Sequence, residues 1–298
     1  MKTLFKGLFV TLCCLFGVIL LTAGLLFGII YSKYDINLIT FFSEIRHLNE
    51  KVNVNNLVTN PYSDDDIESI IEQTNEKVEN LFSYDKNNGF IVSTENITIK
   101  DLSNPVLKFS DTQLAAVADN IIDNREDITI KMGKDIKLKE LGFELLQIDF
   151  EYLENNKTSF NVVFKIESAF IKNKLTTFPL NFGKKIIPDE FYISSTINIH
   201  KNEDKFSYTT EGTKLLLNNL TKAETDDMFN TFNKLAKTGT SLQFANKITS
   251  TVVDVLIGNE NNDGFIYSLK KYGADDFAFT KIDNIDYLTV NFMTFDNL

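Results

Sequence analysis

The spacing of apolar residues changes along the chain, and the first pattern is an unbroken apolar run. Residues 8–31 make up 24 consecutive positions without a charge or a proline. At 1.5 Å per residue, a helix of this length spans a hydrocarbon core of roughly 30 Å. A cleavable signal peptide has an apolar stretch of only about 7–15 residues. We therefore expect an uncleaved transmembrane helix over residues 8–31.

The charges beside this run predict its orientation. Lys2 and Lys6 precede it with no acidic residue, whereas Asp35 and Glu44 follow it. By the positive-inside rule, residues 1–7 stay in the cytoplasm and the chain from residue 32 is translocated. The sequence thus predicts a single-pass protein of the cell membrane with an extracellular main domain.

Beyond the run, apolar residues recur at helical spacing. Four such positions in residues 35–50 predict a short amphipathic helix within a juxtamembrane stalk over residues 32–62. A second helix is expected after Ser63, an N-cap residue followed by three aspartates near the positive end of the helix dipole. Its apolar positions keep the spacing of one buried face as far as Phe82. The four stalk positions are Ile36, Ile39, Phe42 and Ile45.

From residue 90 the apolar spacing falls to two, which is typical of strands. The clearest alternation covers residues 160–166, and residues 145–153, 192–199 and 205–210 continue the pattern. Because polar residues fill most intervening places, these strands are expected to be half-buried and antiparallel.

Capping boxes mark the start of three further helices. Strands and helices are segregated along the chain, which implies an α+β fold in which helices cover one face of an antiparallel sheet. We expect this extracytoplasmic domain to occupy residues 63–298. The boxes are Ser110 with Gln113, Thr221 with Glu224, and Thr240 with Gln243.

The charge balance narrows the choice of partners. The chain has 30 basic and 41 acidic residues. Its first 33 residues hold three lysines and no acid, so the outer part is more acidic than the whole. This balance argues against nucleic acid and against electrostatic docking on anionic lipid, because both require a basic surface.

Cysteine usage excludes further kinds of site, and the amino-acid bias of the chain indicates its source. Cys13 and Cys14 both lie in the predicted span, so the outer domain has no disulfide, thiol nucleophile or cysteine metal site. Lysine greatly outnumbers arginine, 26 phenylalanines occur and tryptophan is absent. This bias indicates an AT-rich genome, typical of a low-GC bacterium, and makes the phenylalanine content weak support for an aromatic pocket.

Candidate chemical sites are few. His47 and His200 are isolated and cannot build a tri-histidine zinc site. Residues 259–270 resemble half of an EF-hand loop, but Asn259 occupies the first ligand position and Lys270 the place of the bidentate glutamate. We read this segment as a hydrated turn. Neither a nucleophile elbow nor a glycine-rich phosphate loop occurs. We expect no enzyme activity, no cofactor and no metal.

A family resemblance rests on the pattern of one long segment. Residues 106–122 (VLKFSDTQLAAVADNII) read as a strand that leads into a helix. Long strands follow, together with a proline-bounded crossover at residues 175–191 (LTTFPLNFGKKIIPDEF). With its N-terminal anchor, the chain resembles the YpmS-type membrane-anchored proteins of Firmicutes over about residues 103–237. The resemblance implies an outer-surface domain with an architecture similar to tubular lipid-binding proteins, and hence an elongated apolar groove.

Two functional hypotheses remain open. The first is a membrane-tethered, non-catalytic binding module that holds a lipid or lipid-linked molecule in an apolar groove. The second is a cell-envelope assembly or adaptor protein that docks on another membrane protein. Clean alternation over residues 160–166 favours a single buried face, whereas residues 141–146 are apolar on both sides. The groove or core candidates are Phe143, Leu145, Leu146, Phe160, Val162, Phe164 and Ile166.

Overall fold

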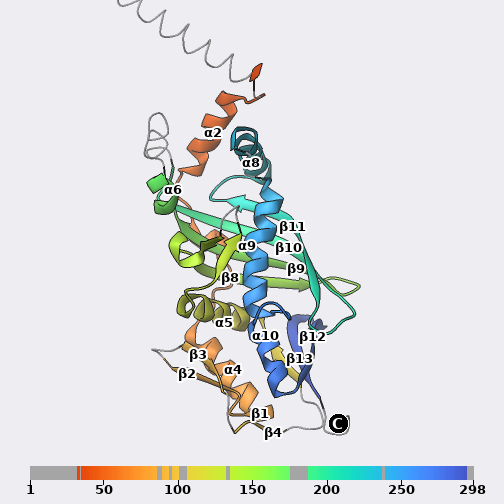
Figure 1. The fold of residues 1–298 in the computed structure, drawn as a ribbon. Coiled ribbons are helices and arrows are strands. Elements are labelled where there is room, and N and C mark those ends of the chain that lie inside the picture. The colour runs from red at the N-terminus through yellow and green to blue at the C-terminus, as the bar shows by residue number, and fades with distance from the viewer. Residues whose placement is uncertain are drawn as a thin grey trace, which may run out of the picture.

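The structure has a mixed α+β fold with antiparallel sheets (Figure 1). It is a computed structural model that describes residues 32–33, 35–85, 89–93, 96–100, 106–131, 135–174, 187–236 and 239–293. The predicted span at residues 8–31 and most of the crossover at 175–191 lie outside these ranges. Within them, no helix is both long and apolar enough to cross a membrane.

A four-stranded antiparallel sheet forms the centre of the molecule, with strand order β11-β10-β9-β8. Its strands are β8 (Glu144–Tyr152), β9 (Lys157–Glu167), β10 (Glu190–Lys201) and β11 (Tyr208–Leu217). The register places Phe164 of β9 between Leu145 of β8 and Ile193 of β10. The alternation predicted for residues 160–166 therefore continues across neighbouring strands as one apolar face.

Helices cover that apolar face (Figure 1). Helix α9 (Ser241–Leu256) packs on β10 and β11, and α5 (Asp111–Asn124) packs on β8 and α9. Both helices begin at the predicted capping boxes: Gln113 N–H donates to Ser110 Oγ at 3.3 Å, and Gln243 N–H donates to Thr240 Oγ1 at 3.2 Å. Each box satisfies amide groups that lack a partner within the helix.

A second, three-stranded sheet joins residues far apart in the sequence. It has the order β12-β13-β5, with β12 (Ala274–Ile282), β13 (Ile285–Phe292) and β5 (Val106–Phe109). This sheet contacts the end of β8, where the Phe150 and Phe279 rings meet edge to face at 5.4 Å. Before this sheet, the short helix α10 (Phe265–Ser268) is followed by the 3-10 turn η3 (Leu269–Tyr272).

Two predicted elements are wrong in their extent. The helix after Ser63, α4 (Asp64–Lys77), ends before Phe82, because Val78 adopts an extended conformation and Asn80 a left-handed one. Val78 and Phe82 are buried in strands instead, so their helical spacing was coincidental. The strand predicted at 205–210 begins only at Tyr208, after Phe206 with a φ of 57°. The strands that hold Val78 and Phe82 belong to two short antiparallel pairs: β1 (Val78–Glu79) with β4 (Thr98–Ile99), and β2 (Phe82–Asp85) with β3 (Gly89–Val92).

The helix predicted in residues 35–50 is α2 (Leu38–Leu48), which packs on α8 (Lys222–Ala236) at one end of the molecule (Figure 1). Ile36 and Ile45 are buried, but Ile39 and Phe42 are 76% and 52% exposed. Ile36 precedes the helix, and the other three positions do not share one face, because a repeat of three residues drifts around a helix of 3.6 residues per turn. Other elements are α3 (Val54–Leu57), β6 (Thr129–Lys131), β7 (Asp135–Lys137), η1 (Leu138–Leu141) and α6 (Ala169–Lys174).

Candidate functional site

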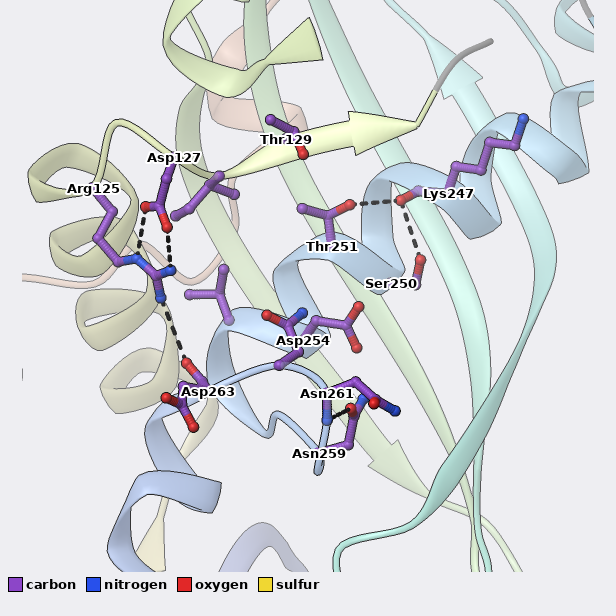
Figure 2. Close-up of a pocket in the computed structure, with 13 residues that line it drawn as sticks. Arg125, Asp127, Thr129, Lys247, Ser250, Thr251, Asp254, Asn259, Asn261 and Asp263 are labelled. Carbon is purple, nitrogen blue, oxygen red and sulfur yellow. Dashed lines mark hydrogen bonds and ion pairs between the residues drawn. The ribbon is translucent and has the colours of Figure 1, made fainter. Parts of the chain in front are cut away.

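A polar cleft of about 610 Å³ lies where α9, the residues after α5 and the loop after α9 meet (Figure 2). Its lining comes from three separate segments, within residues 125–129, 247–255 and 259–263. Most of these side chains are polar. Ligand pockets are usually lined mainly by apolar side chains, so a cleft of this kind fits a polar ligand.

The wall formed by α9 is a polar stripe. Lys247, Ser250, Thr251 and Asp254 follow the 3, 4, 7 spacing of one helix face and all line the cleft. The hydroxyls of Ser250 and Thr251 donate to the Lys247 carbonyl at 3.1 and 2.9 Å (Figure 2). The opposite face of α9 carries Ile248 and Val252, which are buried against the sheet. Core packing therefore holds the polar stripe toward the cleft.

The ion pair of Arg125 with Asp127 forms the facing wall. The Arg125 guanidinium donates to both carboxylate oxygens of Asp127, at 3.0 Å from Nε and 2.7 Å from Nη2. Its Nη1 donates to the Asp263 carbonyl at 3.5 Å, which links this wall to the loop after α9 (Figure 2). This hydrogen bonding raises the pKa of Arg125 and lowers the pKa of Asp127. The two charges largely compensate each other, and the fork geometry fixes both side chains.

Asp254 lies deeper in the cleft. Burial is the main cause that raises the pKa of its carboxyl, and hydrogen bonds from Tyr208 and Asn262 oppose that shift. The Tyr208 hydroxyl donates to Asp254 Oδ1, and burial raises the pKa of this phenol. The carboxylate is thus partly desolvated, and one of its oxygens already has a donor.

The loop that resembled half of an EF-hand closes the cleft as a tight turn. Asn259 and Asn262 exchange backbone hydrogen bonds at 2.9 and 3.0 Å. Gly258 has a φ of 73°, and a Cβ placed on it would lie 2.2 Å from the backbone nitrogen of Gly264. Only glycine fits such an approach. Among the described residues, no group of three or more histidine, cysteine, aspartate or glutamate side chains is arranged to hold a metal ion.

Six of the seven groove or core candidates lie together in the main core, no more than 8% exposed. The Phe143 and Phe164 rings stack there at 5.0 Å. Leu146 is only partly buried, and together with Leu145 it lines a second cleft. Residues 141–146 appear apolar on both sides because they do not form one strand. The 3-10 turn η1 ends before Gly142, which has a φ of 55°, and β8 begins only after it. The six are Phe143, Leu145, Phe160, Val162, Phe164 and Ile166.

The second cleft, also about 610 Å³, lies along the edge of β8. Its lining combines apolar residues of segment 54–62 and the pair Leu145 and Leu146 with three acids. Burial, followed by the charges of Asp123 and Glu144, raises the pKa of Asp119 to about 6. The three acids repel phosphate, so the cleft does not suit the headgroup of an anionic lipid.

The two histidines occupy unrelated places. The Nδ1 atom of His47 lies 2.8 Å from Glu224 Oε1, where α2 meets α8. His200 lies on β10, opposite Thr209 of β11 and Lys157 of β9. The sequence alone does not mark the polar stripe on α9 as a site. Its helical spacing was visible, but every amphipathic surface helix carries a similar stripe.

Comparison of the chain with protein-family models, with curated proteins and with solved structures finds no match. The resemblance to YpmS-type proteins therefore stays a prediction.

Proposed function

We propose that this chain is a membrane-tethered, extracytoplasmic and non-catalytic binding module, and that it holds a polar, hydroxyl-rich molecule in the cleft between α9 and Arg125. A saccharide of the cell envelope, free or lipid-linked, has this chemistry. The supporting observation is the cleft lining: amide, hydroxyl, carboxylate and guanidinium groups from three segments face one space. A sugar hydroxyl both donates and accepts, so it can use all of them.

The charges support a neutral ligand. The lining includes Arg125 and Lys247 against three aspartates, and the Arg125 charge is already paired with Asp127. A polyanion would meet a net negative surface. A non-catalytic role is supported by the state of two carboxylates that line the cleft, since the exposed Asp127 is engaged by Arg125 and the half-buried Asp254 by Tyr208. An apolar groove has less support, because six of its seven candidate residues lie in the core.

Native mass spectrometry and titration test the proposal. Full-length protein in neutral detergent should bind a chitin tetrasaccharide or another envelope oligosaccharide, measured by calorimetry. We expect Asn261→Ala together with Asp254→Asn to weaken binding at least tenfold, because both residues line the cleft. Asn173→Ala, at an exposed position on α6, is the matched control and should bind normally. Co-purified phospholipid without saccharide binding would overturn the assignment in favour of a lipid groove.

One observation favours the adaptor hypothesis as a second candidate. Ile39 and Phe42 on α2 are large apolar side chains with high exposure. They follow closely on the predicted span, where another membrane protein could cover them. Changing both to serine should then shift the detergent-solubilised complex to a smaller size on native gels. Ile285→Ser, at a comparably exposed position on β13, should leave the size unchanged.

A further inference from the structure

Glu44 is a buried carboxylate without a complete set of partners. It lies on α2, it is only 3% exposed, and its Oε1 atom has no hydrogen-bond partner among the described residues. It lines a cleft of about 390 Å³ between α2 and α8. Burying an ionised carboxylate without a partner is unfavourable by several kcal/mol. The site therefore requires a proton or a cation.

The surroundings of Glu44 make it more negative. Asp227 and Glu224, both on α8, are the acids that act on its carboxyl. Burial, followed by these two charges, raises the pKa of Glu44 to about 7. On α2 itself, Arg46 and His47 occupy the following positions.

Three basic side chains near the cleft have acidic partners of their own. Lys234 donates to the Asp35 carbonyl at 2.7 Å and lies 3.2 Å from Asp35 Oδ2. His47 contacts Glu224 at 2.8 Å, and Lys222 lies 2.7 Å from Asp226. In the described part of the chain, each of these three side chains has an acidic partner other than Glu44.

The remaining lining suits an organic cation better than a metal ion. Thr40, Asn230 and Thr231 supply hydroxyl and amide oxygens, and the Phe41 side chain forms part of the wall. An ammonium group donates up to three hydrogen bonds and is attracted to an aromatic face. The Phe41 ring offers no ligand atom to a metal ion. Within the described ranges, no three acids are arranged to bind one.

We propose that the cleft between α2 and α8 binds an ammonium group, with Glu44 and Asp227 as its acidic acceptors. The cation replaces the proton that Glu44 otherwise carries near neutral pH. This site lies apart from the polar cleft of α9 and does not depend on the function proposed for that cleft. The ammonium group can come from a soluble amine or from the headgroup of an aminophospholipid, because the recognised chemistry is the same.

Calorimetry on the full-length protein at pH 7 tests this proposal with ethylammonium as the soluble probe. Nanodiscs of phosphatidylethanolamine and of phosphatidylglycerol supply the lipid arms. We expect proton release on binding, detected by repeating the titration in buffers of different ionisation enthalpy. Glu44→Gln and Asp227→Asn should each weaken binding at least tenfold, and Glu44→Gln should abolish the proton release. Glu68→Gln, an exposed position on α4, is the control.

The arms separate the possible outcomes. Binding of ethylammonium in detergent supports a soluble amine, and Glu44-dependent binding only in phosphatidylethanolamine nanodiscs supports a lipid headgroup. Tetramethylammonium has the charge but no N–H donor, so it should bind more weakly. The proposal is overturned if no arm shows binding that depends on Glu44, or if the wild type and Glu44→Gln bind ethylammonium equally.

Discussion

The inner face of the four-stranded sheet and the junction of α2 with α8 bury polar groups in opposite ways. Under α9, the hydroxyl of Thr249 donates to Ser195 Oγ at 2.6 Å, and Ser195 donates to the Ala245 carbonyl at 3.3 Å. Apolar side chains surround this short chain of bonds. At the junction, the Glu44 carboxylate is just as deeply buried but keeps an oxygen without a partner. A hydrogen-bonded polar group stabilises its interface at any pH, so we call the first a permanent interface. A buried carboxylate without a partner makes the stability of its interface depend on pH and on bound cations, so we call the second a conditional interface.

The largest expected effect tests the permanent interface. Phe164→Ala removes a ring that is fully buried between Leu145 and Ile193, so it should lower the free energy of unfolding by on the order of 3–5 kcal/mol. Lys165→Ala, the neighbouring residue on the opposite face, should cost at most about 1 kcal/mol. Denaturant melts measure both. Equal and small losses would show that the strand does not face the core, and a folded Phe164→Ala protein that loses bound lipid would restore the groove hypothesis.

A pH effect tests the conditional interface. The pKa of Glu44 is raised from 4.5 to about 7 in the folded protein, so docking of α2 is strongest below pH 4.5 and weakens as the pH rises through 7. We expect a loss of about 1–3 kcal/mol between pH 5 and pH 8.5 in the absence of amines. Hydrogen exchange of the α2 amides reports it.

Glu44→Gln should abolish this pH dependence, since glutamine does not titrate. The groups that face Glu44 are Asp227 and Glu224, so Asp227→Asn should reduce the dependence in part. An unchanged pH profile in Glu44→Gln would assign the effect to another group.

The smallest expected effect compares two buried threonines. Thr249→Val breaks the bond to Ser195 and should lower the free energy of unfolding by about 1 kcal/mol. Thr74 of α4 is also fully buried, but its hydroxyl has no partner in the described structure. Thr74→Val should therefore be neutral or stabilising in the same thermal melts. A loss at Thr74 that matches the loss at Thr249 would contradict the distinction between satisfied and unsatisfied groups.

Local patterns predicted the elements that local forces determine. The box of Ser110 with Gln113 needs only adjacent residues, and the helix starts there. The alternation at Phe164 likewise follows from one strand having one buried face. By contrast, Val78 and Phe82 fit a helix and a strand equally well in spacing. Pairing with distant strands decided between them, and a single sequence does not contain that information.

The candidate sites depended still more on tertiary structure. Asp254 and Arg125 are more than a hundred positions apart, and nothing near either residue marks them as neighbours. Glu44 reads as an ordinary polar position on an amphipathic helix, and only the packing of α2 on α8 buries it. In the sequence, the segment after Asn259 resembles half of an EF-hand loop. Its place beside Arg125 became visible only in the folded chain.

The segment beside β8 has a consequence for association between molecules. As the last strand of its sheet, β8 could in principle pair with a strand of another chain. The backbone amides of Thr59 and Asn60 instead bind the Gln147 side chain at 2.7 and 3.0 Å, and the Tyr62 hydroxyl donates to the Leu145 carbonyl at 3.1 Å. This part of the chain shields the edge at both residues and so protects the sheet from edge-to-edge aggregation.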